Sequence, residues 1–394
     1  MDLVKTILNK AEEYKDYTAN NLSKLIKIKS LSGKEEGVAN ALKQMMEEAG
    51  FDEVRIDGLG NVIGRIGNGK KIIAIDGHID TVDLGNLDAW DFDPLGGEIK
   101  NGFVLGRGAA DQTGGPVAAV TAGKILKEIG LPDDITIYVT GTVMEEDCDG
   151  LCWNYIIEEE KIKPDCVIVT EPTNLNIYRG HRGRMEIEVS FYGLSSHGSA
   201  PERGKNAIYM ASKAALEIEK LNEKLTVDPF LSKGSVTVTE FVSSSPSLCA
   251  VSDFAKIHLD RRLTWGEDRE LALNQVKAIV KGMNAKVELL NYEKISFTGL
   301  KYGMEKYYPT WKIEEDHKVI KSGVKTFTEL FNQKPKVDKW TFSTNAVSIN
   351  GIHKIPVIGF GPGNEELAHA PNEKVPIEHL VNASAFYAFF CYNF

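Results

Sequence analysis

The chain has few of the features that mark secreted or membrane proteins. It holds only five cysteines in 394 residues, an odd number at irregular spacing, which argues against a disulfide framework. No stretch approaches the ~20 apolar residues of a membrane span. The N-terminal segment is charged throughout and lacks the apolar region of a secretory signal. We therefore expect a cytoplasmic protein with no membrane partner.

Basic residues are outnumbered by acidic ones. The chain has 46 Lys and Arg against 56 Asp and Glu, which gives a net charge of −10. Such a chain is a poor partner for nucleic acid or for an anionic membrane surface. An anionic small substrate stays open, because a local basic pocket can override the overall charge. The length predicts two domains, and 42% hydrophobic with 26% charged residues is a globular composition.

Apolar runs alternate with amphipathic segments over the first 180 residues. Buried strands are predicted at 72–77, 135–143 and 166–171, and helices at 2–29, 34–49, 115–129 and 151–160. Ser32 is expected to cap the second of these helices. A further strand at 355–361 and a helix at 376–390 continue the alternation near the end of the chain. This pattern predicts an α/β fold with a mostly parallel sheet flanked by helices.

The pattern changes from Arg184 onwards. Polar and apolar residues now alternate with a period of two, as in half-exposed strands. Strands are predicted at 185–193, 235–242, 254–263 and 285–293, and helices at 205–224 and 267–282. The order βαββαβ is the ferredoxin-like plan. We therefore predict one domain from residues 1–180 and 294–394, with a small α+β domain inserted at 181–293.

Ionisable residues follow the ends of the predicted strands, and one more lies in the loop before the helix at 115–129. The strand-end residues are His78, Asp80, Glu145, Glu146, Glu171 and His369, and the loop residue is Asp111. Ligands of open α/β sheets collect at the carboxyl ends of the strands, so these side chains are expected to converge. Two histidines and several carboxylates at one edge would repel one another unless a divalent cation bound there. Mixed nitrogen and oxygen ligands suit Zn²⁺, with Mn²⁺ or Co²⁺ as alternatives.

Each of these residues has an ordinary interpretation when it is taken alone. A histidine with an aspartate two residues later is frequent in loops after strands. Glu145-Glu146 suits a solvated helix start, and Glu171-Pro172 suits a turn. His369 alone suits a loop. The segment 58–64, GLGNVIG, mimics part of a nucleotide fingerprint, but it lacks an acidic partner at the required spacing and predicts a hairpin instead.

Five motifs in order resemble the M20 family of dinuclear metallohydrolases. They are His78-x-Asp80, the stretch GRGAADQTGG with Asp111, the pair Glu145-Glu146, Glu171 and the late His369. The family includes acetylornithine deacetylase, succinyl-diaminopimelate desuccinylase, aminoacylase and carboxypeptidase relatives. TEPTN, GHRGRMEI, SSHGSAPERG and FSTNAV look closest to a subgroup labelled selenium-metabolism-linked hydrolases. The resemblance spans essentially the whole chain, and it implies a zinc-exopeptidase-like domain with an inserted lid and dimerisation domain.

The resemblance also implies a ligand set for two Zn²⁺ ions per chain. His78 and Glu171 would hold one metal, and Glu146 and His369 the other. Asp111 would bridge them.

Three catalytic roles carry over in the same way. Asp80 would accept the other ring N–H of His78 and fix its tautomer. Glu145 would be the general base that takes a proton from the attacking water and delivers it to the leaving nitrogen. His197, in SSHGSAP, would reach the active site of the other subunit of a homodimer and stabilise the oxyanion. The dimer would form through residues 181–293.

The implied substrate is a small amino-acid-like molecule with a carboxylate. Arg262, in an Asp-x-Arg motif, would bind that carboxylate, helped by backbone N–H groups of Gly361 and Gly363. The implied reaction is metal-dependent hydrolysis of a linear amide, N-acyl or N-carbamoyl bond. A dipeptidase or carboxypeptidase is an alternative within the family. A metal-stabilised binding protein without catalysis is an alternative of a different class.

Some positions depart from the common family pattern. Gln112-Thr113 follows the bridging aspartate where relatives usually have x-Lys, Cys249 begins a stretch that is usually Asn-x-x-Pro, and Asn345 replaces an aspartate. No predicted metal ligand is lost, so the implied chemistry stands while the substrate stays open. Arg182, Arg184, Cys249 and Asn345 receive no role, and His181 has at least as good a structural interpretation.

Overall fold

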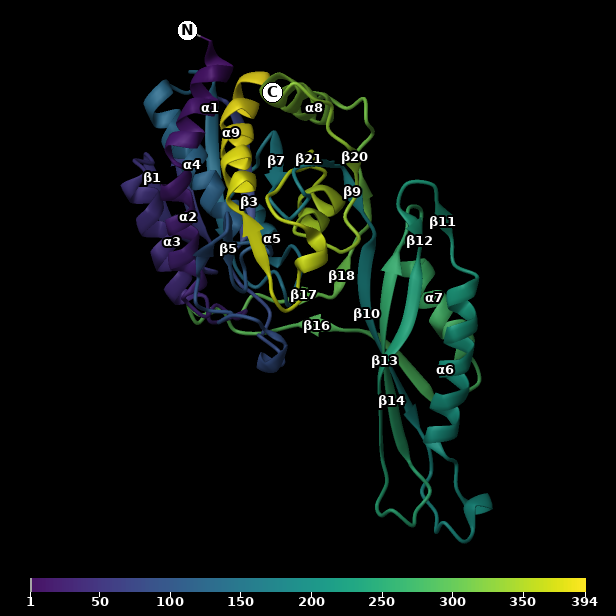
Figure 1. The fold of residues 1–394 in the computed structure, drawn as a ribbon. Coiled ribbons are helices and arrows are strands. Elements are labelled where there is room, and N and C mark those ends of the chain that lie inside the picture. Colours follow the sequence, from purple (N-terminus) through teal and green to yellow (C-terminus); the bar gives the residue numbers. More distant parts are fainter. Residues whose placement is uncertain (1) are drawn as a thin grey trace.

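The computed structural model describes residues 2–394, whose larger part is built on an eight-stranded sheet (Figure 1). The strand order is β1-β2-β6-β3-β7-β21-β8-β20. The bounds are β1 Glu53–Ile56, β2 Val62–Ile66, β6 Ile135–Thr142, β3 Lys71–His78, β7 Cys166–Val169, β21 Val357–Gly359, β8 Ile177–Tyr178 and β20 Val337–Asp338. The central strands β6, β3, β7 and β21 run parallel, whereas β1 and β2 form the predicted antiparallel hairpin. The predicted α/β fold with a mostly parallel central sheet is therefore confirmed.

The helices of the larger part follow the predicted order. They are α1 Leu3–Glu13, α2 Lys15–Ile26, α3 Glu36–Glu48, α4 Gly114–Ile129, α5 Leu151–Glu158, α8 Lys318–Phe331 and α9 Ile377–Asn393, with a π-helix at Val347–Ile352. The single helix predicted at 2–29 is wrong, because the chain breaks at Tyr14 into two helices. Within residues 2–394, no helix combines the length and the apolar character that a bilayer crossing needs.

Ser32 does not cap α3. The residue before that helix is Glu35, and no side chain caps the helix start. The Ser32 hydroxyl instead donates to Asp80 Oδ2 at 2.7 Å. A buried carboxylate is a stronger acceptor than a neutral group, so it attracts the hydroxyl that the sequence pattern assigned to the helix.

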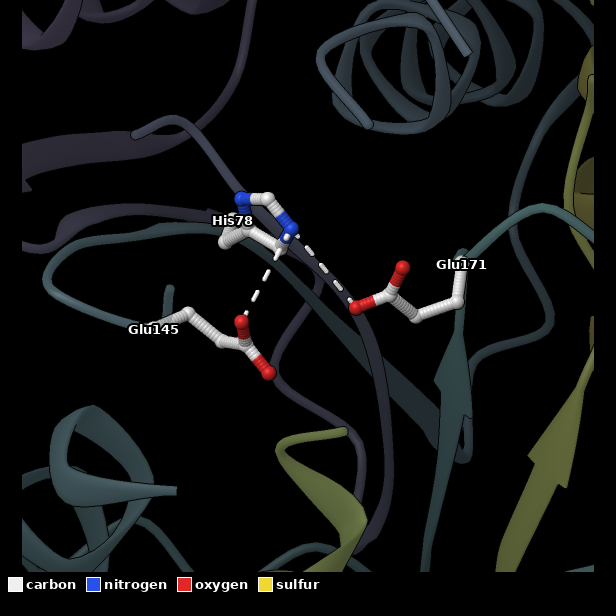
Figure 2. A group of neighbouring side chains, drawn as sticks. All are labelled: His78, Glu145 and Glu171. Atoms are coloured by element: carbon white, nitrogen blue, oxygen red, sulfur yellow. Dashed lines mark ion pairs between the residues drawn. The ribbon is translucent and has the colours of Figure 1, made fainter. Parts of the chain in front are cut away.

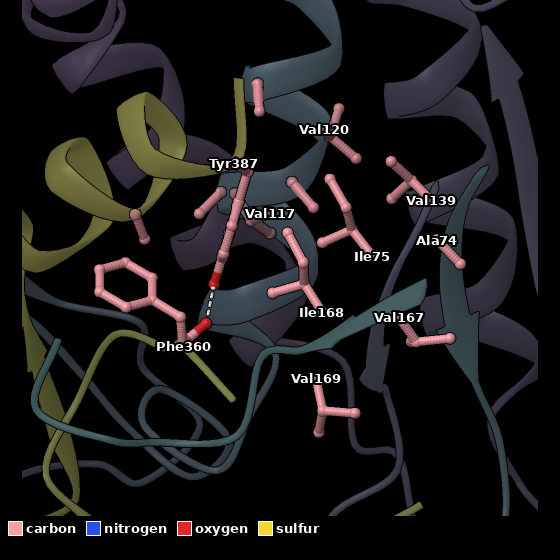
Figure 3. Close-up of a cluster of buried hydrophobic side chains, with 14 of the residues drawn as sticks. Ala74, Ile75, Val117, Val120, Val139, Val167, Ile168, Val169, Phe360 and Tyr387 are labelled. Carbon is pink, nitrogen blue, oxygen red and sulfur yellow. Dashed lines mark hydrogen bonds between the residues drawn. The ribbon is translucent and has the colours of Figure 1, made fainter. Parts of the chain in front are cut away.

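The apolar strand that carries His78 is fixed in a tightly packed core (Figure 3). Ile75 of β3 and Ile168 of β7 are buried against α4, which also packs on α9. On α9, the Tyr387 hydroxyl donates to the Phe360 carbonyl oxygen at 2.8 Å. Dense packing of this kind leaves little freedom to the backbone at the strand ends.

The smaller part is an antiparallel sheet of order β13-β14-β10-β15 with two helices. Its elements are β10 Gly183–Tyr192, α6 Ala207–Glu223, β13 Ser235–Ser244, β14 Phe254–Leu263, α7 Arg269–Ile279 and β15 Ala285–Leu289. This is the predicted ferredoxin-like order, and its buried side chains form a hydrophobic cluster of their own. One strand from later in the chain, β18 Tyr307–Tyr308, also pairs with β10. Figure 1 shows this sheet extending away from the larger part.

Short elements complete the fold. They are β4 Ile99–Lys100, β5 Phe103–Leu105, β9 Gly180–His181, β11 Val227–Asp228, β12 Ser232–Lys233, β16 Asn291–Tyr292, β17 Met304–Glu305, β19 Trp311–Lys312 and β22 Lys374–Pro376, with 3₁₀ turns at Leu87–Ala89, Pro201–Arg203 and Glu365–Leu367.

His181 lies buried where the chain passes from the larger to the smaller sheet. Its ring packs edge-on against Trp311, with centroids 5.3 Å apart, and its Nε2 accepts a hydrogen bond from the Thr344 backbone N–H at 3.2 Å. Nδ1 lies 2.8 Å from the Arg182 carbonyl oxygen and donates to it. Both ring nitrogens are used by a neutral ring, and burial lowers the pKa of His181 to about 4. The structural interpretation of this residue fits these contacts.

We expect His181 to make the protein less stable in acid. The unfolded ring titrates near a pKa of about 6.5 and the folded ring near 4, so the unfolded state binds the extra proton as pH falls. The stability is fully present above pH 6.5 and is lost towards pH 4, by roughly 3 kcal/mol. Urea unfolding of metal-free wild type and His181→Asn at pH 7.5 and 4.5 measures this. Equal pH dependence in both proteins would contradict it.

Candidate metal centre

Three parallel strands bring their following residues to one edge of the large sheet. His78 ends β3, Glu145 follows β6 and Glu171 follows β7. Figure 2 shows both glutamates turned towards the imidazole ring. His78 Nε2 lies 3.7 Å from Glu171 Oε1 and 3.9 Å from Glu145 Oε2. All three side chains are nearly inaccessible to solvent.

Asp111 lies between the two predicted histidine ligands. Its Oδ1 is 3.1 Å from His78 Nε2, and its Oδ2 is 3.3 Å from His369 Nε2. His369 Nε2 also lies 2.9 Å from Glu146 Oε2. Two groups, His78 with Glu145 and Glu171, and His78 with Asp111 and Glu146, place their ligand atoms within 4.8 Å of one another. The structure therefore brings all five predicted metal ligands together.

The charges of this cluster are not balanced by the described protein atoms. Burial raises the pKa of Glu171 well above its ordinary value, and the Asp111 and Glu146 carboxylates raise it further, although His78 opposes them. Glu145 Oε1 and Glu171 Oε2 are buried without a hydrogen-bond partner among residues 2–394. Such oxygens are costly unless a cation or donor meets them. The donor set of imidazole nitrogens and carboxylate oxygens fits divalent transition-metal ions.

The histidines respond to the same crowding. Hydrogen bonds to Asp111 and Glu146 raise the pKa of His369 to about 10. Burial acts to raise the pKa of Asp111, but the hydrogen bonds from His369 and His78 outweigh it and hold that pKa well below its ordinary value. The positive charge of the protonated histidines thus offsets part of the negative charge of the carboxylates. A bound divalent cation would offset this charge more completely.

The prediction that the Asp80 carboxylate accepts the ring N–H of His78 is wrong. His78 Nδ1 lies 2.8 Å from the Asp80 backbone carbonyl oxygen, and the Asp80 carboxylate is further away at 3.7 Å. The ring N–H therefore donates to the backbone. The carboxylate accepts from the backbone N–H groups of Glu145 at 3.2 Å and Glu146 at 3.1 Å. Asp80 fixes the imidazole through its backbone and the two glutamates through its side chain.

Glu373 is a positioning residue that the sequence did not reveal. Its buried Oε1 accepts from the backbone N–H groups of Ala110 and Asp111, both at 2.9 Å. Its Oε2 accepts from Arg107 at 2.7 Å. These bonds hold the backbone of the central aspartate. Glu373 lies 262 residues from Asp111 in the chain, so no local pattern links the two. The one hint in the sequence is that Glu373 follows His369 closely.

We expect Glu373→Gln to lower metal affinity by roughly tenfold or more, as is usual when a partner behind a ligand is changed. A glutamine has one acceptor oxygen and no charge. If that oxygen accepts from the two backbone N–H groups, the amide N–H₂ group faces the Arg107 cation. Competition with a chromogenic chelator measures the affinity, and circular dichroism checks the fold. A folded variant with wild-type affinity would contradict the assigned role.

A pocket of about 310 Å³ is lined by the predicted metal ligands and by Glu145. The other residues that line it are Asp149, Arg184, Arg262, Phe342, Ser343, Glu365 and Ala368. Arg262 on β14 lies directly opposite Arg184 on β10. The Asp260 carboxylate accepts from Arg262 through two bonds of 2.7 and 3.0 Å, which fixes the guanidinium. Arg262 and Arg184 therefore both line this pocket, and the carboxylate-binding role of Arg262 stays a prediction.

Several pocket residues received no role from the sequence. Asp149, the adjacent Phe342 and Ser343, and Glu365 come from three separate segments, and only Phe342 and Ser343 fall in a stretch, FSTNAV, that the sequence singled out. Asn345 does receive a structural explanation. Its amide donates to buried Asp76 at 3.0 Å and its oxygen accepts from the Gly150 N–H at 3.0 Å, so a neutral side chain there suits the neighbouring carboxylate.

Some predicted site residues do not line this pocket. The Gly361 N–H donates to Thr173 Oγ1 at 3.0 Å, and the Gly363 N–H donates to His379 Nδ1 at 3.3 Å. Both donors have partners, so the structure does not support their predicted role in carboxylate binding. Arg182 donates to the Lys233 carbonyl oxygen at 2.8 Å. His197 is exposed in the loop between β10 and α6.

Comparisons with known proteins agree with this geometry. The family model described as peptidase family M20/M25/M40 matches residues 74–393. An uncharacterized protein of Escherichia coli K12, YgeY, is 52% identical over 98% of this chain and 96% of its own length. A probable succinyl-diaminopimelate desuccinylase of Staphylococcus epidermidis is 32% identical over 48% of this chain and 47% of its own. The crystal structure of aminopeptidase PepT from Bacillus cereus superposes with a TM-score of 0.73 at 23% identity, covering 95% of this chain and 97% of that one.

Proposed function

The chain belongs to peptidase family M20/M25/M40 and is a metallohydrolase of amide or peptide bonds, and from this premise we propose that it cleaves a linear N-acyl or N-carbamoyl bond of a small amino-acid-like carboxylate. One observation carries the proposal. Two histidines and four carboxylates converge on the floor of a pocket whose wall presents Arg262. The proposed metal centre and the proposed carboxylate-binding group would therefore share one cavity.

The residues present fit two metal ions. His78 and Glu171 would hold one, Glu146 and His369 the other, and Asp111 would lie between them. One oxygen of Asp111 already faces each histidine, which supports the bridging role. Two Zn²⁺ ions, or Mn²⁺ or Co²⁺ in their place, would supply Lewis acidity for the attacking water and the scissile carbonyl.

Glu145 is the proposed general base. It is buried beside the metal ligands, and its Oε1 has no partner among the described residues. Burial raises the pKa of its carboxyl well above the ordinary value. A carboxylate with a raised pKa accepts a proton from water more readily and returns it to the leaving nitrogen. Because Glu145 Oε2 also lies 3.9 Å from His78 Nε2, the base sits next to the ligand cluster.

His197 is the proposed oxyanion donor, supplied by a second copy of the chain. The Ser199 backbone N–H donates to His197 Nδ1 at 3.1 Å, so the proton of the neutral ring lies on Nε2. An exposed Nε2–H is the donor that a tetrahedral oxyanion requires. The ring does not line the pocket of its own chain among the described residues, which favours donation across a dimer.

Residues 181–293 offer a surface for such a homodimer. β13 is an edge strand of the smaller sheet, and an unpaired edge can accept another strand. Phe241 and Val242 on this strand, and Tyr209 and Leu216 on α6, are exposed apolar side chains. We propose that the segment 181–293 forms both the dimer contact and the lid over the pocket.

A substrate panel tests the proposed reaction. Metal-loaded protein is incubated with N-acetyl, N-succinyl and N-carbamoyl amino acids and with dipeptides, with and without a chelator. We expect chelator-sensitive hydrolysis of one N-acyl or N-carbamoyl class. Preference for dipeptides would replace the proposal with a peptidase. No turnover of any compound at full metal load would favour the binding protein without catalysis.

A further inference from the structure

One carboxylate in the pocket has no role in the proposed metal centre. Asp149 precedes α5, lines the pocket and is only 2% exposed. Its Oδ1 accepts from Arg184 at 3.2 Å. Its Oδ2 is buried and has no hydrogen-bond partner among residues 2–394. One oxygen of this carboxylate is thus hydrogen-bonded to the protein, and the other is not.

Arg184 holds Asp149 in a fixed orientation. The guanidinium also donates to Glu186 at 2.7 Å and lies over the Tyr308 ring, 5.0 Å from its centroid. Glu186 in turn accepts from Lys306 at 2.8 Å. Because the arginine is held from several sides, the carboxylate that it binds cannot swing freely to find a second partner. Asp149 lines the pocket, so a ligand bound there can supply the partner that this oxygen lacks.

Two more oxygens of the pocket share this property. Ser343 Oγ and Glu365 Oε2 are buried without a hydrogen-bond partner among the described residues, and both residues line the same pocket. The neighbouring cation Arg262 is already paired with Asp260. Unpartnered buried acceptors are costly, and a ligand that donates hydrogen bonds removes the cost. A positively charged donor does so best, because charge-assisted hydrogen bonds are the strongest.

We propose that Asp149 is a specificity-determining residue that binds a protonated amino group of the substrate. This inference rests on the proposed function and narrows it. The substrate carries an ammonium group in addition to the carboxylate and the scissile amide. The ammonium is either the α-amino group of a dipeptide or an amine on the side chain of an N-acyl amino acid. Both sources offer the same chemistry to Asp149 Oδ2.

Matched pairs of substrates, in which a methyl group replaces the ammonium, test the inference. Ala-Ala is compared with isobutyryl-alanine, and Nα-acetyl-2,4-diaminobutyrate with N-acetylnorvaline. We expect wild type to prefer the amine in one pair by at least about tenfold in kcat/KM, since sites built for hydrogen bonding reject analogues that lack the donor. The pair that shows the preference identifies the source of the amine.

Asp149→Asn keeps the shape of the side chain and removes its charge. We expect this variant to bring the amine-to-methyl ratio close to one, mainly through a higher KM for the amine. Asp147→Asn is the matched control, because Asp147 lies two residues away, is paired with Lys294 and does not line the pocket. Its ratio should stay at the wild-type value. A purely structural role of Asp149 would leave the ratio unchanged, and that result overturns the inference.

A binding measurement separates this inference from the proposed reaction. Calorimetry compares 2,4-diaminobutyrate with norvaline, and Ala-Ala with isobutyryl-alanine, on metal-loaded protein. If no panel compound is hydrolysed but an amine binds tighter in wild type and not in Asp149→Asn, the proposed reaction fails and the amine site stands. If neither turnover nor binding in wild type distinguishes amine from methyl, the amine site is wrong.

Discussion

Replacing Glu145 with glutamine is expected to lower kcat by about 10²–10⁴-fold, the usual contribution of a general base. The amide keeps the size of the side chain but cannot take the proton at the Oε1 position. Metal content should stay at the wild-type level, because the five proposed ligands are untouched. Steady-state kinetics on the best panel substrate, with metal analysis of the same samples, measures both quantities.

Asp147→Asn is the control for the Glu145 variant. Asp147 lies in the same turn but is paired with Lys294 at 2.8 Å and does not line the pocket. This control should keep wild-type activity. Full activity of Glu145→Gln would contradict the assigned base. Loss of metal from that variant would instead assign Glu145 as a ligand with His78 and Glu171, which their spacing permits.

Replacing His197 with alanine is expected to lower kcat by about 10²–10³-fold, the usual cost of losing one oxyanion donor. The variant loses the Nε2–H that is proposed to donate to the oxyanion. In the wild type, the Ser199 N–H donates to Nδ1 and so keeps the ring proton on Nε2. Substrate affinity should change less than kcat, because the developing negative charge exists only in the transition state.

Mixed dimers show whether His197 acts on its own pocket or on its partner's. In a dimer of His197→Ala with Glu145→Gln, one of the two pockets has both an intact base and an intact donor. Random exchange of equal amounts should restore about a quarter of wild-type activity, since half of the dimers are mixed. Mixing Glu145→Gln with Glu146→Gln is the control and should restore none. Failure of the first mixture to regain activity would contradict donation across the dimer.

The convergence of the proposed metal ligands is predictable from the sequence because the strands that carry them have a simple apolar pattern. The run from Ile72 to Ile75 is continuously apolar, so its burial in a parallel sheet follows from composition alone. Strand ends of such a sheet share one edge, and this rule alone predicts that His78 lies beside Glu145 and Glu171. The ferredoxin-like order of the smaller sheet follows in the same way from its alternating strands.

The remaining features depend on contacts between distant segments. Ser32 has a suitable position for a helix cap, yet the Asp80 carboxylate, 48 residues away, binds its hydroxyl. The N–H groups of Gly361 and Gly363 have no partner that the sequence pattern reveals, but both are bonded in the fold. Asp149 is unremarkable in the sequence, because its burial and its unpartnered oxygen arise only when Arg184 from the other sheet meets it.

The most direct test of the metal-dependent reaction is a titration of metal-free protein with Zn²⁺. Hydrolysis of the best panel substrate and bound metal are measured on the same samples. We predict that turnover is absent without metal and rises with bound metal to a plateau at about two ions per chain, as a two-metal site requires. Undiminished turnover by protein shown to contain no metal would contradict the account.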